Sequence, residues 1–199
     1  MRLLPSATRR FARRGAAAVL LAAAIAPVRA SPQKKPTAPE VFNGRATIAS
    51  AAGRGDAYVT IRVDRYSAPK DVKSMEQALR DGGSTAFVHA LRQAPVVGRF
   101  EVGTQTFAIR WARQRDAGGK RMISLVTDAP VYFVGGGVPD AKSREGFDVA
   151  VIQLLLDPSG LGDGTMAAAA RVKPGEAGVD VEAYEGDPVK LLSIMRKVT

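Results

Sequence analysis

The sequence contains no cysteine and only one histidine, His89. Without cysteine the chain can form neither a disulfide nor a lipoprotein thiol anchor, so its stability has to come from packing. Zinc sites and Ser–His–Asp triads need partners that a single histidine does not supply. His89 falls within a predicted helix, where a partly exposed histidine without a chemical role is the favoured interpretation. We therefore predict no catalytic residue, no metal site and no cofactor, and we expect binding rather than catalysis.

Aromatic residues are also scarce, at 6% of the chain. An outer-membrane barrel needs girdles of aromatic side chains and an apolar face toward the lipid. In this chain the strand positions that alternate with apolar ones carry Arg, Asp and Glu. The composition therefore argues against a barrel of the outer-membrane type.

The longest apolar run near the N-terminus, Gly15–Ala26, has 12 residues, whereas a transmembrane helix needs about 20. Five arginines precede this run, and no acidic residue occurs before Glu40. Pro27 and then Val28-Arg29-Ala30 follow it, which is typical of a signal peptidase site. The sequence predicts a signal peptide at 1–30, cleaved after Ala30, and export to the periplasm or the extracellular space. We predict no transmembrane anchor in the mature form, and the choice between the Sec and twin-arginine routes stays open.

The whole chain is strongly basic, with 29 basic and 19 acidic residues and a formal net charge of +10. Six of the basic residues lie within the predicted signal peptide. The remaining 23 basic residues against 19 acidic ones leave the mature chain at +4. Most of the basicity that suggests nucleic acid is therefore a targeting device, and we predict no nucleic-acid partner.

Residues 31–40 are rich in proline and lysine and have too little apolar surface to pack, so they are predicted to form a flexible leader. Residues 41–199 are enough for a single β-rich domain with a substantial core.

Apolar and polar residues alternate with a period of two through most of this domain, as they do in half-buried strands. Ala57–Val63 shows the alternation most clearly, and residues 99–102 and 107–112 predict a hairpin around Gly103. Further strands are predicted at 121–127, 147–156, 165–173, 179–184 and 189–196. The pattern predicts a mainly β fold, an antiparallel barrel or sandwich of about eight or nine strands.

One interval departs from the alternation. Residues 67–81 and 84–94 show helical spacing, with Ser67 as the predicted N-cap and with Gly82-Gly83 between the two segments. The sequence therefore predicts a short helical pair after the second strand, which plugs one end of a barrel or covers a sheet.

Two glycine-rich segments resemble ligand-binding loops. Asp157–Gly164 has the composition of a calcium loop but lacks the terminal Glu of an EF-hand, so a β-turn is favoured. Gly135–Gly137 precedes no predicted helix, and a phosphate-binding role is therefore weakly supported.

Arginines gather on the predicted strands, with Arg62, Arg110 and Arg113 as candidate contacts to an anionic ligand. Pairing with Asp and Glu on neighbouring strands accounts for the same residues and is the favoured alternative. Likewise, Phe107, Ile109 and Trp111 are candidate lining residues of a cavity inside a closed barrel. Ordinary core packing is the favoured alternative for these three.

Several segments, taken together, resemble an uncharacterised family of exported bacterial proteins of similar length. They span nearly the whole predicted domain: Val59–Ser67, Ala78–Gly83, Val97–Gly103, Ile109–Arg113, Leu125–Pro130, Phe147–Asp157 and Pro188–Leu191. Trp111 stands where that family has Tyr. Because the family has no assigned activity, the resemblance implies export and domain limits and assigns no catalytic residue.

The sequence favours a non-enzymatic binding module in the periplasm or outside the cell, with a hydrophobic or anionic small ligand or an envelope component as its partner. A lipid-like molecule is the hydrophobic ligand considered. The alternative is a structural or protein-interaction protein of the cell envelope that uses an Arg-bearing sheet face. A carboxylate-based hydrolase is the least supported, because no pair of acidic residues is marked out. The sequence does not specify the oligomeric state.

Overall fold

The computed structural model describes residues 38–50, 53–131, 145–175, 178–184 and 188–197. All of them belong to one compact unit, Pro36–Thr199. The predicted signal peptide, residues 31–37 of the predicted leader and Gly135–Gly137 lie outside the described residues.

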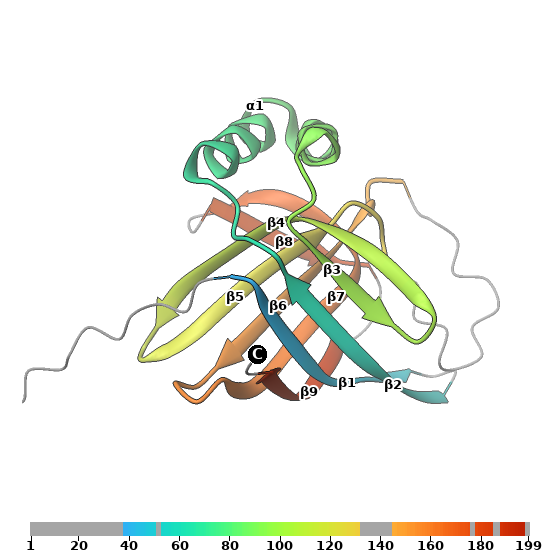
Figure 1. Cartoon of the computed structure of the whole chain (residues 1–199). Helices are drawn as coiled ribbons and strands as arrows, with labels where there is room; N and C mark the ends of the chain where they lie inside the picture. Colours follow the sequence, from blue (N-terminus) through green and yellow to red (C-terminus); the bar gives the residue numbers. More distant parts are fainter. Residues whose placement is uncertain (1–37, 51–52, 132–144, 176–177, 185–187, 198–199) are drawn as a thin grey trace, which may run out of the picture. The chain divides into compact units, whose positions relative to one another are not determined.

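Nine strands and one helix follow one another along the described part of the chain (Figure 1). In order they are β1 (Glu40–Ser50), β2 (Gly53–Val63), α1 (Pro69–Gln93), β3 (Gly98–Val102), β4 (Gln105–Ala117), β5 (Lys120–Thr127), β6 (Val149–Leu156), β7 (Leu161–Gly175), β8 (Gly178–Ala183) and β9 (Val189–Lys197). Each predicted strand has a counterpart in the structure, whereas β1 was not predicted as a strand and begins at Glu40, the last residue of the predicted leader.

The strands form a closed antiparallel barrel, so the mainly β prediction is confirmed and the sandwich alternative is wrong. Their order is β6-β5-β4-β3-β2-β1-β9-β7-β8, and a further pairing between β6 and β7 closes eight of them into a ring. The ninth strand, β8, pairs with the second half of β7, at Ala170–Gly175. The first half of β7 lies between β6 and β9.

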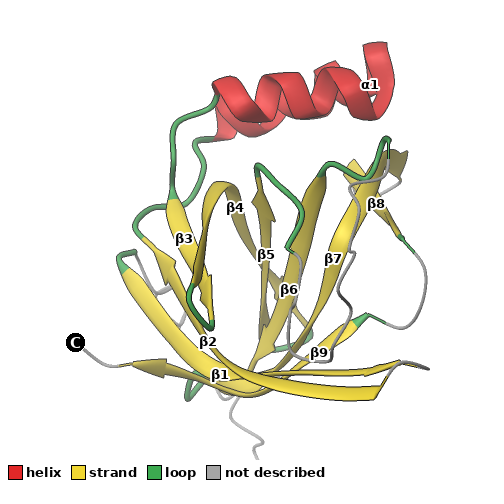
Figure 2. Cartoon of the chain, turned by 90° about the vertical axis from the view of Figure 1, so that its right-hand side faces the viewer, coloured by secondary structure: helices red, strands yellow, loops and turns green. Residues whose placement is uncertain are grey.

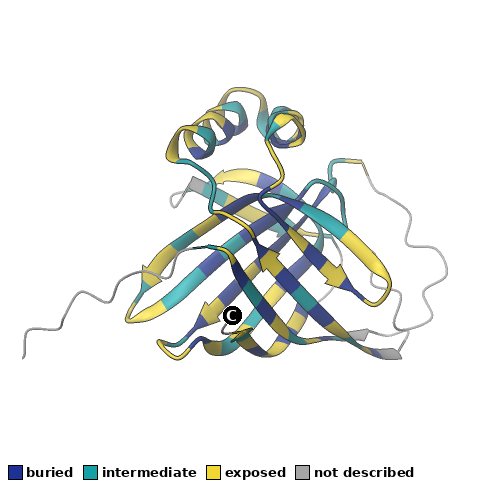
Figure 3. Ribbon diagram, viewed as in Figure 1, coloured by how far each residue is buried: buried dark blue, intermediate teal, exposed yellow. Residues whose placement is uncertain are grey.

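Large apolar side chains fill the inside of the barrel, as expected for a barrel of about eight strands. Buried and exposed residues alternate along the strands in Figure 3, and the predicted inward face of β2 is confirmed, with Val59, Ile61 and Val63 buried. The largest fully buried side chains of the interior include Phe42, Phe100, Ile109, Leu125, Ile152 and Leu154. Each such side chain contributes about 1.5–3 kcal/mol of burial free energy.

A single helix, α1, stands where a helical pair was predicted. Its backbone leaves helical values at Gly83, where φ is 67° and ψ is −160°, so the helix has two arms. A left-handed φ of this kind is readily adopted only by glycine. Ala68, not Ser67, is the N-cap residue. The Ser67 hydroxyl instead accepts a hydrogen bond from the Ala112 backbone N–H on β4, at 3.0 Å.

The helix covers part of the outer wall of the barrel. Figures 1 and 2 place α1 on the side of β4 and β7 and away from β1 and β9. Its apolar side packs on outward-facing side chains of β4 to β7, in a second core that includes Met75, Leu79, Phe87, Trp111, Val126 and Val151. No helix among the described residues is long and apolar enough to cross a membrane.

A buried ion-pair network closes one end of the barrel. Glu40 starts β1 and Arg121 lies near the start of β5, so the antiparallel order brings both to the same end. The Arg121 guanidinium donates to both carboxylate oxygens of Glu40, and Tyr66 Oη donates to Glu40 Oε2 at 2.6 Å. Burial and this hydrogen bond raise the pKa of Tyr66. Burial lowers the pKa of Arg121, but its bonds to Glu40 and Tyr66 outweigh that effect and raise it overall.

Candidate binding groove

A β-bulge in β4 decides which side chains reach the outer wall of the barrel. Ile109 pairs with Thr127 and Trp111 with Val126, so Arg110 is an extra residue on β4. One extra residue inverts the faces of everything that follows it. Ile109 is therefore buried in the barrel interior, whereas Trp111 belongs to the outer core beneath α1.

Both ends of α1 are tied to β4 next to this bulge. Ser67 exchanges two hydrogen bonds with the backbone of Ala112, at 2.9 and 3.0 Å. At the other end of the helix, Arg110 Nη1 donates to the Ala94 carbonyl at 2.6 Å, and Arg110 Nε donates to Asp128 Oδ2 at 2.6 Å. The bulge thus fixes the helix beside the outward-facing part of β4.

Beyond the bulge, three rows of side chains run across the outer face of β4, β5 and β6. The strand register places Trp111, Val126 and Val151 in the first row, Arg113, Ser124 and Gln153 in the second, and Arg115, Met122 and Leu155 in the third. The first row, beside α1, is thus apolar, the second is polar and includes Arg113, and the third adds Arg115 beside two apolar side chains.

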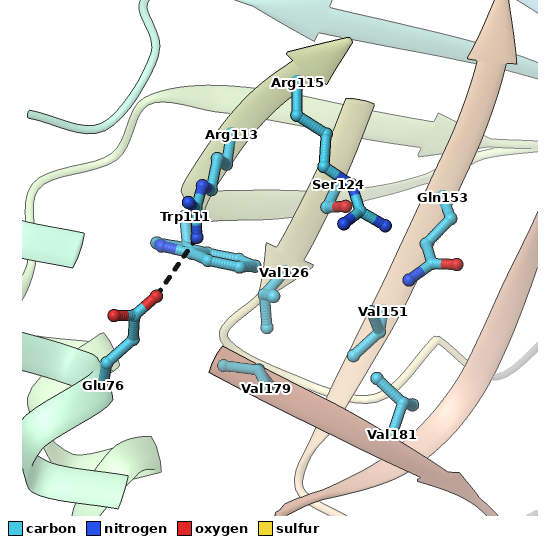
Figure 4. A pocket seen from close by; sticks show the side chains of 10 residues that line it. All are labelled: Glu76, Trp111, Arg113, Arg115, Ser124, Val126, Val151, Gln153, Val179 and Val181. Atoms are coloured by element: carbon cyan, nitrogen blue, oxygen red, sulfur yellow. Dashed lines mark hydrogen bonds and ion pairs between the residues drawn. The ribbon is translucent and has the colours of Figure 1, made fainter. Parts of the chain in front are cut away.

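The first two rows, together with Arg115, form the floor of a groove, which we call the β8 groove (Figure 4). Its sides are Glu76 of α1 and Val179 and Val181 of β8, and both valines point toward Val151. The cavity within it is about 80 Å³, well below the roughly 300–1,000 Å³ of pockets that enclose a small molecule. A ligand of this groove therefore lies across it and inserts only small groups.

The polar groups of the β8 groove carry an excess of positive charge. Arg113 Nη1 pairs with Glu76 Oε1 at 3.2 Å. The Arg115 guanidinium donates to Met122 Sδ from Nε at 3.2 Å and from Nη2 at 3.0 Å, and no ion pair of Arg115 occurs among the described residues. Arg115 is therefore the cation that remains for an anionic group.

An unsatisfied donor lies at the apolar end of the same groove. Trp111 is 6% exposed, and its indole Nε1 is buried without a hydrogen-bond acceptor among the described residues. A buried donor without a partner costs about 1–3 kcal/mol. Because the nitrogen itself is fully covered, this donor is not offered to a ligand in the groove.

The structure separates the three predicted cavity-lining residues. Phe107 packs half-buried against the barrel core, and Ile109 is fully buried within it. Trp111 lines the β8 groove outside the barrel. The three therefore do not share one face, because the bulge at Arg110 lies between Ile109 and Trp111.

The three predicted anion contacts are each engaged with a different carboxylate. Arg62 Nε pairs with Asp64 at 2.6 Å on an exposed part of β2, and this hydrogen bond raises the pKa of Arg62. Arg110 pairs with Asp128 and is half-buried. Only Arg113 lies in the β8 groove. None of these pairs joins residues of two strands, because Asp64 and Asp128 follow β2 and β5 and Glu76 lies on α1.

The remaining motifs have structural roles or none in the described part of the chain. His89 is exposed on α1. Asp157 Oδ1 accepts bonds from the Ser159 hydroxyl, the Ser159 N–H and the Leu161 N–H, which lower the pKa of Asp157 and organise the turn before β7. No cluster of three or more potential metal-ligating side chains occurs among the described residues.

Sequence reasoning did not find Val126, Val151, Val179 or Val181 as groove residues. Each lies in a predicted strand, but the approach of β8 to the outer face of β6 has no local signature. Comparisons with family models, curated proteins and solved structures found no match to this chain. The resemblance to an exported bacterial family therefore stays a prediction.

Proposed function

We propose that this protein is an exported, non-enzymatic binding module that holds an envelope component in the β8 groove. The observation that carries the proposal is the gradient across the groove, from Trp111, Val126 and Val151 to Arg113 and Arg115. An occupant with small apolar groups at one end and an anionic group at the other fits this gradient.

A ligand on the outer wall is better supported than one inside the barrel. The interior positions are occupied by packed side chains, including Phe42, Phe100 and Ile152, which are 0% exposed. The small volume of the groove likewise favours an occupant that lies along the surface over an enclosed lipid-like molecule. A lipid-like ligand remains the second candidate because the valines of the groove give it an apolar surface.

Hydrolysis by a pair of carboxylates has little support at this site. Glu76 is the one acidic residue among those that line the β8 groove, and it is paired with Arg113. Glycoside hydrolysis of the usual kind uses two carboxyl groups on opposite sides of the bond that breaks.

The proposal is tested on the full chain, exported in a bacterial host and recovered from the envelope fraction without detergent. Native mass spectrometry is expected to show the protein with a bound component. In V181E a charge enters the groove and the component is lost. L192E is the matched control, because Leu192 lies on β9 and is 40% exposed, against 37% for Val181.

Recovery of the wild-type protein without any bound component contradicts the proposed function. An adduct of equal occupancy in V181E and the wild type contradicts the assignment of the β8 groove.

A further inference from the structure

The outer edge of β8 carries backbone groups that no described strand pairs with. β8 stands last in the strand order, and β7 is its only partner among the described strands. Tyr184 N–H donates to the Ala169 carbonyl at 2.9 Å, which continues the ladder between β7 and β8. This bond identifies Ala169 and Tyr184 as a hydrogen-bonded pair and so decides which of the following pairs are bonded. In an antiparallel ladder, bonded and non-bonded pairs alternate. The pairs 171–182 and 173–180 are therefore bonded, whereas Val179, Val181 and Ala183 direct their N–H and C=O groups away from β7.

The position of Pro174 agrees with this assignment of bonded and non-bonded pairs. Pro174 lies opposite Val179 in the register, which makes it a member of a non-bonded pair. A proline has no N–H to donate, and within sheets it is tolerated only where none is needed. The outward groups of Val179, Val181 and Ala183, which pair with no described strand, thus lie on the free edge of β8.

This free edge borders the β8 groove. Val179 and Val181 line the groove, whereas no residue of β7 does, so β8 lies between β7 and the groove. The two residues whose side chains enter the groove therefore also present backbone donors and acceptors beside it. Val181 is 37% exposed, so part of its apolar surface is left uncovered.

We propose that the β8 groove binds an extended peptide segment of a partner protein, which adds to β8 as a further strand. Main-chain hydrogen bonds to Val179, Val181 and Ala183 hold the segment, and alternate side chains enter the groove. Neighbouring strands lie about 4.8 Å apart. At that distance from β8, the side chains of the added strand that face the barrel meet the boundary between the row that contains Trp111 and the row that contains Arg113. The segment therefore carries small apolar side chains and a carboxylate that pairs with Arg115. This inference rests on the proposed function, because it names the partner of the same groove.

The first test uses a capped hexapeptide, the length of β8, with Val, Val and Glu at positions 1, 3 and 5 and Thr between them, so that the two Val side chains and the carboxylate lie on one face of the strand. Hydrogen exchange followed by NMR reports its binding. In the free protein the amides of Asp180 and Glu182 are protected and those of Val179, Val181 and Ala183 exchange fast. The peptide is expected to protect the latter three. Unchanged exchange of these three amides at saturating peptide overturns the inference.

The backbone requirement is tested separately on each side of the complex. V181P removes an outward N–H and leaves the ladder to β7 intact, so its affinity is expected to fall about tenfold below that of V181A, which keeps the N–H. Equal affinity of V181P and V181A overturns strand addition. Protection of Asp180 and Glu182 in V181P checks that β8 remains paired.

N-methylated peptides keep the test independent of any folding defect in V181P. Two peptides, methylated at every odd or at every even position, each lose the N–H groups of one edge. At least one of them is expected to bind about tenfold more weakly than the parent. Equal binding of all three peptides overturns strand addition. R115Q is expected to weaken binding about threefold at low salt, and no change in R115Q overturns the assigned carboxylate.

The two proposals fail in different ways. An envelope-derived component on the wild-type protein, together with no response to the peptide, leaves the binding function and overturns the peptide partner. If that component is a lipid, the groove binds amphiphiles and not strands.

Discussion

Removal of the buried carboxylate at the closed end of the barrel is expected to destabilise the protein strongly. The side chains of Glu40 and Arg121 are 4% and 15% exposed, and Tyr66 and Arg196 also contact Glu40. In Glu40→Leu the Arg121 guanidinium stays mostly buried without its carboxylate. Loss of one partner of a buried pair costs about 3–5 kcal/mol, against about 0–1 kcal/mol for an exposed pair.

The double substitution separates the contribution of the ion pair from the cost of leaving one buried charge without a partner. In Glu40→Leu/Arg121→Met neither charge remains, and buried pairs replaced by apolar residues are often neutral. The double variant is therefore expected to be less destabilised than the sum of the single variants by about 2 kcal/mol or more.

Urea denaturation of the mature chain measures these free energies, with the fluorescence of the single tryptophan, Trp111, as the probe. Asp64→Asn is the control, because the Arg62–Asp64 pair is 53% and 43% exposed, and its midpoint is expected to stay unchanged. A loss below about 1 kcal/mol in Glu40→Leu, the range of exposed pairs, refutes the argument. Strict additivity of the two substitutions refutes it as well.

Three further predictions test the fold. Because the pKa of Tyr66 is raised in the folded protein, the unfolded chain loses the Tyr66 hydroxyl proton at a lower pH, so the free energy of unfolding is full below about pH 10 and falls as the pH rises further. In Tyr66→Phe this fall in the free energy of unfolding should be smaller. A urea midpoint that varies with pH between pH 8 and pH 11 as in the wild type argues against this role of Tyr66. Leu125→Ala should cost about 2–5 kcal/mol in urea denaturation because Leu125 is fully buried, whereas Leu192→Ala, 40% exposed, should cost about 0.5 kcal/mol or less; similar losses contradict the interior placement. Gly98→Ala should cost about 3 kcal/mol or more because its Cβ falls 2.2 Å from the Arg62 carbonyl oxygen; a wild-type midpoint means that the two strands lie farther apart.

The candidate groove could be predicted only in part. Trp111 and Arg113 stood out in the sequence as an aromatic residue and a cation on a strand, and both line the groove. Val179 and Val181 did not stand out, because valines in a strand look alike whether they face a core or a groove. Their role follows from the approach of β8 to the wall of the barrel, which local residues do not encode.

The sequence by itself determined every described strand except β1, and also the helical interval, because a period of two or of 3.6 is a local property of the chain. It did not determine the closure of the ring between β6 and β7, since closure depends on the summed twist and register of all the strands. It also did not determine the face of Trp111. Alternation identifies two faces but cannot say where a bulge exchanges them. Glu40 was assigned to a flexible leader for a similar reason, because the guanidinium that buries it lies 81 residues away. Only the tertiary structure brings such distant partners together, and the groove, the bulge and the ion pair all depend on contacts of that kind.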